Sequence, residues 1–236
     1  MPINDPVVWW KLDDGTGTTA ADSSGNGFTA TMSGGASWDT GQFGGSMAFD
    51  GVDGALTCDL SSLDGGTDAT FAAWVKRTDE VPGGEPSGGF ADFGTSGASG
   101  SSHYPYINGF LYLGLFNNDN TRPISGYDDT GFDKRNWHHV VITQAPGTDG
   151  YKLYRNGSLV TQGTGLSAAT FGSDDGLAVG RPGGFIYFDG NFEQVRLYDR
   201  ALNSTEVSDL YAWTAGGAGD MAWIYVRRTR ILNQTC

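Results

Sequence analysis

Carboxylates and histidines are the side chains through which this 236-residue chain could do chemistry, and their spacing does not favour catalysis. A glycoside hydrolase needs two carboxylates that face one sugar, and the spacing E-x-D-x-x-E along a strand supplies them. Glu193 comes closest, but the residue two positions after it, Val195, is not acidic. His138 and His139 are neighbours on an expected strand, so they face opposite sides and cannot share a site. We therefore expect no enzyme activity.

Cysteine spacing and the remaining chemical motifs give the same result. The chain has two cysteines, Cys58 in a strand-like segment and Cys236 at the end, and we expect no disulfide between them. The sequence shows no zinc-ligand spacing, phosphate-binding loop or nucleophile elbow. The fold must therefore be stabilised by its hydrophobic core, and cysteine usage does not indicate a compartment.

The charge is strongly negative, with a formal net charge of −13 and a pI near 4.3. Nucleic acid and anionic membrane surfaces are therefore not expected as partners, because both require clustered Lys and Arg. An acidic surface favours solubility and suits divalent cations, although a simple solvated surface accounts for most of the charge.

Short alternating apolar segments separated by glycine turns predict an all-β fold, and the alternation at 109–117 predicts one of its strands. The chain contains 38 Gly and 13% aromatic residues, as expected for many short strands joined by tight turns. Segments 78–108 and 118–136 are rich in turn residues and are expected to form loops at the rim, the first around a short strand at 89–93. One helix is expected near the end, where Asn203 and Glu206 have capping-box spacing before Val207 and Leu210.

Five sequence blocks resemble the laminin-G-like, concanavalin A-like lectin family over about residues 7–212. They read WKLDDG at 10–15, ADSSGNG at 21–27, SMAFDGVDG at 46–54, WHHVVIT followed by KLYRNGSLV within 137–160, and GNFEQVRLYDRALN at 190–203. In the last block Glu193 and Gln194 stand where the family usually has Asp and Glu. The resemblance implies a two-sheet antiparallel jelly-roll sandwich with one short C-terminal helix.

The same resemblance implies one structural Ca²⁺ ion, held between the loop of the ADSSGNG block and the closing strand. Carried over to this sequence, its ligands are Asp22 and Glu193, with Asn26 as a helper. Asn191 is added because it is close in sequence. Oxygen ligands of this kind suit calcium, but Asp22 could equally close an Asx-turn without a metal.

Aromatic residues in the expected rim loops are candidates for glycan contact. They are Tyr104, Tyr106, Tyr127 and Tyr187, with Phe185 nearby. The alternative is that they belong to the core, as most aromatic residues of a sandwich do.

The last 24 residues differ from the rest of the chain, so we divide it into a domain at 1–212 and a tail at 213–236. A glycine-rich hinge at 215–219 leads to an apolar run and a basic end. The tail carries three Arg and one Asp, a net charge of +2, which leaves −15 for the domain. Such a segment could add a strand to the sheet edge of a partner, or it could be a disordered terminus. The residues expected to dock are Met221, Trp223, Ile224, Tyr225, Arg227 and Arg228.

The N-terminal residues have neither a basic region nor a long apolar run, so no signal peptide or membrane span is expected. Two functions fit these observations. The first is a non-catalytic, adhesive surface module that decorates a larger assembly such as a virion capsid and docks through its tail. The second is a calcium-dependent carbohydrate-binding lectin. An exposed aromatic side chain beside carboxylates would favour the second.

Overall fold

The computed structural model describes residues 5–63, 66–77, 91–93, 101–107, 111–117, 124–128, 135–165, 176–180 and 187–215. For residues 92–93, 101–107, 111–117, 124–128 and 165 the description covers the backbone alone. These ranges contain sixteen strands and one helix. The helix is not long and apolar enough to cross a membrane.

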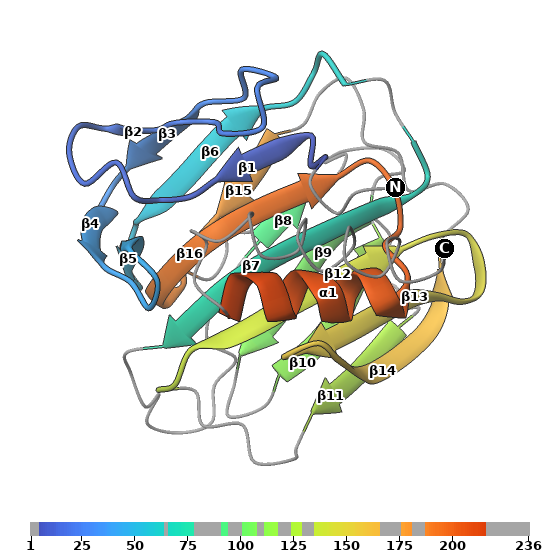
Figure 1. Ribbon diagram of the computed structural model, residues 1–236. Helices are drawn as coiled ribbons and strands as arrows, with labels where there is room; N and C mark the ends of the chain where they lie inside the picture. The colour runs from blue at the N-terminus through green and yellow to red at the C-terminus, as the bar shows by residue number, and fades with distance from the viewer. Residues whose placement is uncertain are drawn as a thin grey trace, which may run out of the picture.

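The largest sheet has eight antiparallel strands and forms one layer of a sandwich (Figure 1). Its order is β14-β13-β12-β7-β16-β5-β4, and β1 pairs with the second half of β16. The strands are β1 Val8–Trp10, β4 Ser37–Thr40, β5 Gly45–Asp50, β7 Ala69–Arg77, β12 His138–Gln144, β13 Gly147–Arg155, β14 Ser158–Gly165 and β16 Asp189–Tyr198. Asn156 and Gly157 form the hairpin turn between β13 and β14, with positive φ at both residues.

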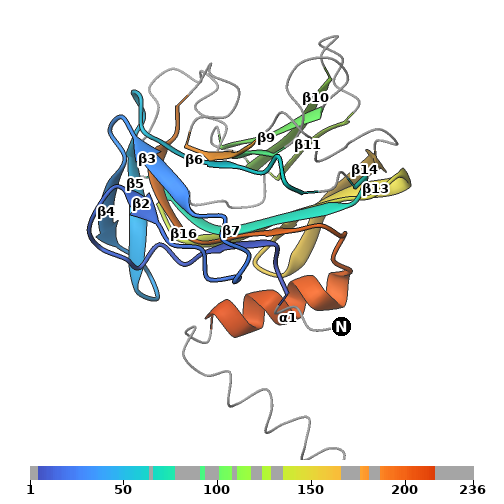
Figure 2. The ribbon, with the colours of Figure 1, turned by 90° about the horizontal axis from the view of Figure 1, so that it is seen from above.

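Two smaller sheets form the opposite layer (Figure 2). One is ordered β2-β3-β6-β15-β8 and contains β2 Thr19–Ala20, β3 Ala30–Ser33, β6 Ala55–Asp59, β8 Ala91–Phe93 and β15 Gly176–Val179. The other, which we call the small sheet, is ordered β11-β10-β9 and contains β9 Ser101–Ile107, β10 Leu111–Asn117 and β11 Ile124–Asp128. The predicted all-β sandwich with one C-terminal helix is confirmed.

Two of the expected rim loops contain strands, so the sequence prediction was wrong for 101–107 and 124–128. Both segments pair with β10, the strand in this region whose alternation predicted it. Their own signal was weak because Ser, Gly and Pro dilute it. Pro105 is compatible with β9 because this strand lies at the edge of the small sheet, where proline is tolerated.

Side-chain alternation along the central strands builds the core between the layers. On β7, Phe71, Ala73 and Val75 are fully buried and belong to the main core, whereas Ala72 belongs to a second cluster on the outer face of the sheet. Trp9 and Trp10 divide in the same way: Trp10 is in the main core, and Trp9 packs against the outer cluster. The two adjacent tryptophans therefore face opposite sides of the sheet, as alternation along a strand requires.

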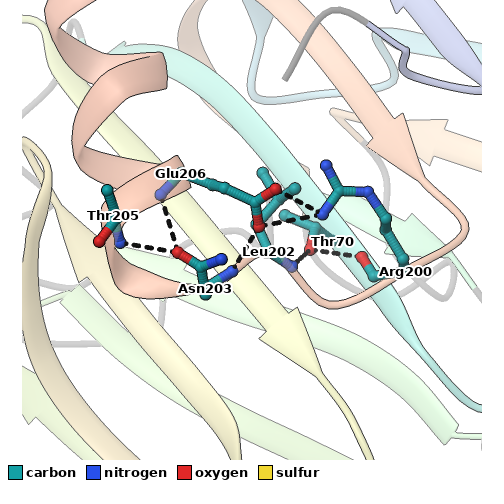
Figure 3. Close-up of polar contacts among 6 residues, drawn as sticks. All are labelled: Thr70, Arg200, Leu202, Asn203, Thr205 and Glu206. Atoms are coloured by element: carbon teal, nitrogen blue, oxygen red, sulfur yellow. Dashed lines mark hydrogen bonds and ion pairs between the residues drawn. The ribbon is translucent and has the colours of Figure 1, made fainter. Parts of the chain in front are cut away.

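The outer cluster lies beneath the single helix, α1 Ser204–Ala215, which covers part of the outer face of the large sheet (Figure 2). The predicted capping box is present: Asn203 Oδ1 accepts the N–H groups of Thr205 and Glu206, and Glu206 Oε2 accepts the N–H of Asn203 at 2.9 Å (Figure 3). Arg200 pairs with Glu206, and the hydroxyl of Thr70 bridges the chain between β16 and the helix.

The helix extends three residues beyond the expected domain boundary. Trp213, which was assigned to the tail, lies in its last turn and is only 7% exposed. Its ring packs edge-to-face against Trp9, and the guanidinium of Arg196 lies 4.7 Å from the ring centroids of both tryptophans. The last turn of α1 is thus part of the body of the protein.

Candidate functional site

Asp22, the first predicted calcium ligand, organises the loop between β2 and β3. Its Oδ1 accepts the N–H groups of Trp9 at 3.0 Å and Ser24 at 2.9 Å. Its Oδ2 accepts the N–H of Phe28 at 2.9 Å and the hydroxyl of Ser24 at 2.7 Å. Burial alone would raise the pKa of Asp22, but these hydrogen bonds outweigh it and the pKa is lowered. The ionised carboxylate therefore closes an Asx-turn and ties the loop to β1.

Glu193, the second predicted ligand, holds a different turn. Its carboxylate is 1% exposed and accepts the N–H of Gln42 at 2.8 Å and that of Phe43 at 3.0 Å, in the turn between β4 and β5. Burial raises the pKa of Glu193, the two amides partly offset the rise, and the charge of Asp13 adds to it.

The next residue, Gln194, begins an irregularity in the pairing of β16 with β7. Gln194 has a φ of +56°, and the register between the two strands shifts after Glu193. Its side-chain oxygen accepts the indole N–H of Trp9 at 3.0 Å and a guanidinium N–H of Arg196 at 2.8 Å. Gln194 thereby links β1 to the residues packed beneath the end of α1.

The two predicted asparagine ligands also lie in different places, one in the loop of Asp22 and the other on the strand of Glu193. Asn26 belongs to the loop of Asp22 and donates its side-chain amide to the carbonyl of Val7. Asn191 donates to Asp39 and Ser46 on the strands beside it.

The four predicted ligands thus have partners in two different places, and within the described ranges no cluster of three or more metal-ligating side chains occurs. The hydrogen bonding of Asp22 fits the metal-free alternative. The calcium site stays a prediction that a calcium titration tests.

Three tyrosines lie in one row across the small sheet. Tyr112 on β10 is the Cα partner of Tyr106 on β9 and of Tyr127 on β11. Tyr104 lies two residues before Tyr106, so it belongs to the same face of the sheet. The alternate rows of the small sheet belong to the opposite face, and they contain Leu111, Leu113, Leu115, Ile107 and Ile124.

Tyr112 was not among the sequence candidates, although a signal for it existed. Its strand was predicted from alternation, and Leu111, Leu113 and Leu115 alternate with Tyr112 and Gly114. The tyrosine falls on the face without leucine. The pairing partners of β10 were read as loops, so the row could not be assembled.

The other candidates divide between described and undescribed residues. Tyr187 lies just before β16 and is half-buried. Phe185 and all six predicted docking residues of the tail, from Met221 to Arg228, lie outside the described residues.

The one histidine that lies beneath α1, His139, is not suited to proton transfer. It is fully buried, and its ring packs against both Trp74 and Tyr211, with centroid separations of 5.4 and 5.9 Å. Burial, with a smaller effect from the charge of Arg196, lowers its pKa to about 3, so the ring is neutral. Among the described residues, neither ring nitrogen has a hydrogen-bond partner.

Comparison with solved structures shows the same architecture in several binding domains. The binding domain of Paraclostridial Mosquitocidal Protein 1 matches with a TM-score of 0.66 at 15% identity, covering 89% of this chain and 52% of that one. Domain 4 of AbnA, an extracellular arabinanase from Geobacillus stearothermophilus solved with arabinotriose, matches with a TM-score of 0.66 at 17% identity, covering 88% and 98%.

The ligand-binding domain of botulinum neurotoxin serotype D, solved with N-acetylneuraminic acid, gives a TM-score of 0.67 at 15% identity over 89% and 51%. This chain therefore spans about half the length of the toxin domains that it matches. No curated protein matches the sequence.

The sequence model of one family matches residues 49–208, about two thirds of the chain. The match covers the strands from β6 to β16 and the first part of α1. The sheets, the closing strand and the capped helix agree with the blocks that suggested this family, and the chain belongs to the concanavalin A-like lectin/glucanases superfamily.

Proposed function

We propose that this protein is a non-catalytic carbohydrate-binding module, with its sugar platform on the small sheet. The row of Tyr106, Tyr112 and Tyr127 carries the proposal. An antiparallel sheet normally packs its apolar face on the core and leaves the other to solvent. The leucine rows occupy one face, so the tyrosine row is the proposed outer face. Tyrosine residues at one register position of neighbouring strands supply the groups that such a platform needs, which are apolar rings for sugar C–H groups and hydroxyls for sugar oxygens.

The structural neighbours support this choice of ligand class. Domain 4 of AbnA was solved with arabinotriose, and the serotype D toxin domain with N-acetylneuraminic acid. The arabinotriose complex, matched over 98% of its length, shows that the architecture can bind a saccharide, although fold alone does not assign a site.

Substitutions in the tyrosine row test the proposal. Wild type, Tyr112→Ala and Tyr127→Ala are each titrated with arabinotriose and with N-acetylneuraminic acid. The three proteins are then screened on a glycan array. We expect each alanine to weaken binding about tenfold, because it removes one stacking contact, whereas Tyr112→Phe keeps the ring and most of the affinity. Binding that is unchanged in both alanine variants would refute the platform, and no binding to any glycan would refute the function. Repeating the titration with EDTA tests whether binding depends on calcium.

We also propose, as the second candidate, that the module is displayed on a larger assembly through the chain that follows α1. The support is the position of the helix end, since Ala215 is exposed and α1 lies on the outside of the sandwich (Figure 2). The helix thus ends at the surface of the sandwich.

A variant that ends at Ala215 tests this second candidate. It should keep its sugar affinity and lose incorporation into the assembly, for which a virion is the proposed example. Incorporation that survives the truncation would refute docking through the tail.

A further inference from the structure

One part of the outer face of the large sheet is not covered by α1 and combines polar and aromatic groups. We call it the outer-face strip, and it consists of Asp39 on β4, Ser46 on β5, Asn191 on β16, Lys76 on β7 and Trp137 just before β12. Asp39 is the Cα partner of Ser46, and Asn191 is the Cα partner of Lys76. Asn191 is the Cα partner of Ala48, two residues along β5 from Ser46, so the strip crosses four neighbouring strands diagonally on one face of the sheet.

A buried amide fixes the carboxylate of the strip. Asn191 is 2% exposed and donates its side-chain N–H groups to Asp39 Oδ2 at 2.9 Å and Ser46 Oγ at 3.1 Å. The backbone N–H of Thr40 donates to the other oxygen of Asp39 at 2.7 Å. The bond from Asn191 is the main cause of the lowered pKa of Asp39, so this exposed carboxylate stays ionised. Each of its oxygens retains a lone pair for a ligand hydroxyl.

At the other end of the strip, a cation lies against an aromatic ring. The ammonium of Lys76 is 5.3 Å from the ring centroid of Trp137, and both side chains are half-exposed. Within the described part of the chain, no hydrogen bond or ion pair occupies the ammonium group, so its N–H donors are open to a ligand. The strip thus presents a fixed acceptor, a free donor and an aromatic surface.

We propose that the outer-face strip is a second saccharide site, which binds one neutral pyranose residue. Two adjacent hydroxyls donate to the carboxylate of Asp39, and the ammonium of Lys76 donates to a further sugar oxygen. Trp137 contacts the apolar C–H groups of the ring. The charges of Asp39 and Lys76 compensate, so the strip gains nothing from an acidic sugar. The chemistry is that of the proposed function, but the small sheet lies in the opposite layer of the sandwich (Figure 2).

The indole N–H resonance of Trp137 tests the site directly. In ¹⁵N-labelled full-length protein, the resonance is assigned as the indole signal that disappears in Trp137→Phe. It is then followed during titration with methyl galactoside, methyl mannoside and N-acetylneuraminic acid. We expect at least one neutral glycoside to shift it, with at most a weaker effect from the acidic sugar. Lys76→Met should lower the affinity about tenfold, as loss of one charge-assisted hydrogen bond predicts, and Lys152→Met on β13 is the matched control.

The possible failures are distinguishable from failure of the proposed function. If no neutral glycoside shifts the Trp137 signal, the second site does not exist, whatever the small sheet does. If the signal shifts equally in wild type and Lys76→Met, the sugar does not bind at the strip and the inference is wrong. A shift that persists in Tyr112→Ala separates the strip from the tyrosine row.

Discussion

Asp22 and Glu193 each hold backbone N–H groups with both carboxylate oxygens, yet their pKa values move in opposite directions. Asp22 is half-exposed and accepts four hydrogen bonds, which outweigh the effect of burial. Glu193 is almost fully buried and holds only two amides, so burial prevails. The two acids should therefore respond oppositely to pH.

Asp22→Asn tests the first acid. The variant replaces an acceptor of four hydrogen bonds by an amide whose nitrogen faces N–H donors, so the free energy of unfolding should fall by about 2 kcal/mol at neutral pH. The folded pKa is lowered, so the stabilisation is present above the unfolded pKa near 4 and is lost as the pH falls through the folded value. Urea unfolding at several pH values measures this loss.

Running the same unfolding curves in EDTA and in excess calcium also tests the calcium prediction. A loss that grows in calcium identifies Asp22 as a ligand, and an equal loss in both assigns it to the Asx-turn alone. Undiminished stability of Asp22→Asn in both would contradict the account of the loop.

Glu193→Gln tests the second acid. A raised folded pKa means that the folded protein binds the proton more tightly than the unfolded chain does. The contribution of this group to stability is therefore greatest below the unfolded pKa of about 4.3 and declines as the pH rises through the folded value. The unfolding free energy of Glu193→Gln, relative to wild type, should thus rise between about pH 4 and pH 7. A difference that is constant over this range would show that Glu193 keeps an ordinary pKa.

At the scale of elements, α1 was predictable at its start and not at its end. Asn203 and Glu206 are three residues apart, and this local spacing is enough to locate a capping box. The last turn depends on contacts with Trp9 and Arg196, which are distant in sequence, so no local pattern could place Trp213 in the helix. For the same reason, the attachment of Glu193 to a turn 150 residues away was missed.

Asn203→Ala measures what the cap contributes. The variant leaves the N–H groups of Thr205 and Glu206 without their side-chain acceptor, and we expect a loss of about 1 kcal/mol in unfolding free energy. Ser208→Ala, at an exposed position of the same helix, is the control and should change stability little. Equal effects of the two substitutions would mean that the cap contributes nothing.

For the whole molecule, the family blocks predicted the sandwich, whereas the platform depended on pairings that the sequence did not show. The blocks lie in the large sheet, its turns and the N-terminal loop, where alternation and glycine turns are clear. The tyrosine row needs the register of β9, β10 and β11. The outer-face strip likewise joins residues from β4 to β12, and only the strand order brings them together.

The strand order also decides where the body of the protein ends, because the helix packs on the outer cluster of the large sheet. Two truncations test this boundary. A chain that ends at Ala215 keeps Trp213, and we expect the unfolding free energy of wild type. A chain that ends at Ala212 matches the boundary expected from sequence. It loses Trp213 and uncovers Arg196 and Trp9, so it should be less stable by about 3 kcal/mol, as for removal of a buried tryptophan.

Thermal and urea unfolding of the two truncated proteins, side by side, make the measurement. If the two truncated proteins were equally stable, the burial of Trp213 against Arg196 would contribute nothing to the stability of the fold, and Trp213 would belong to the tail. A loss confined to the shorter chain would make the chain ending at Ala215 the correct one for the assembly and sugar-binding experiments. If the chain ending at Ala212 failed to assemble, the cause could be either the missing tail or the destabilised helix α1.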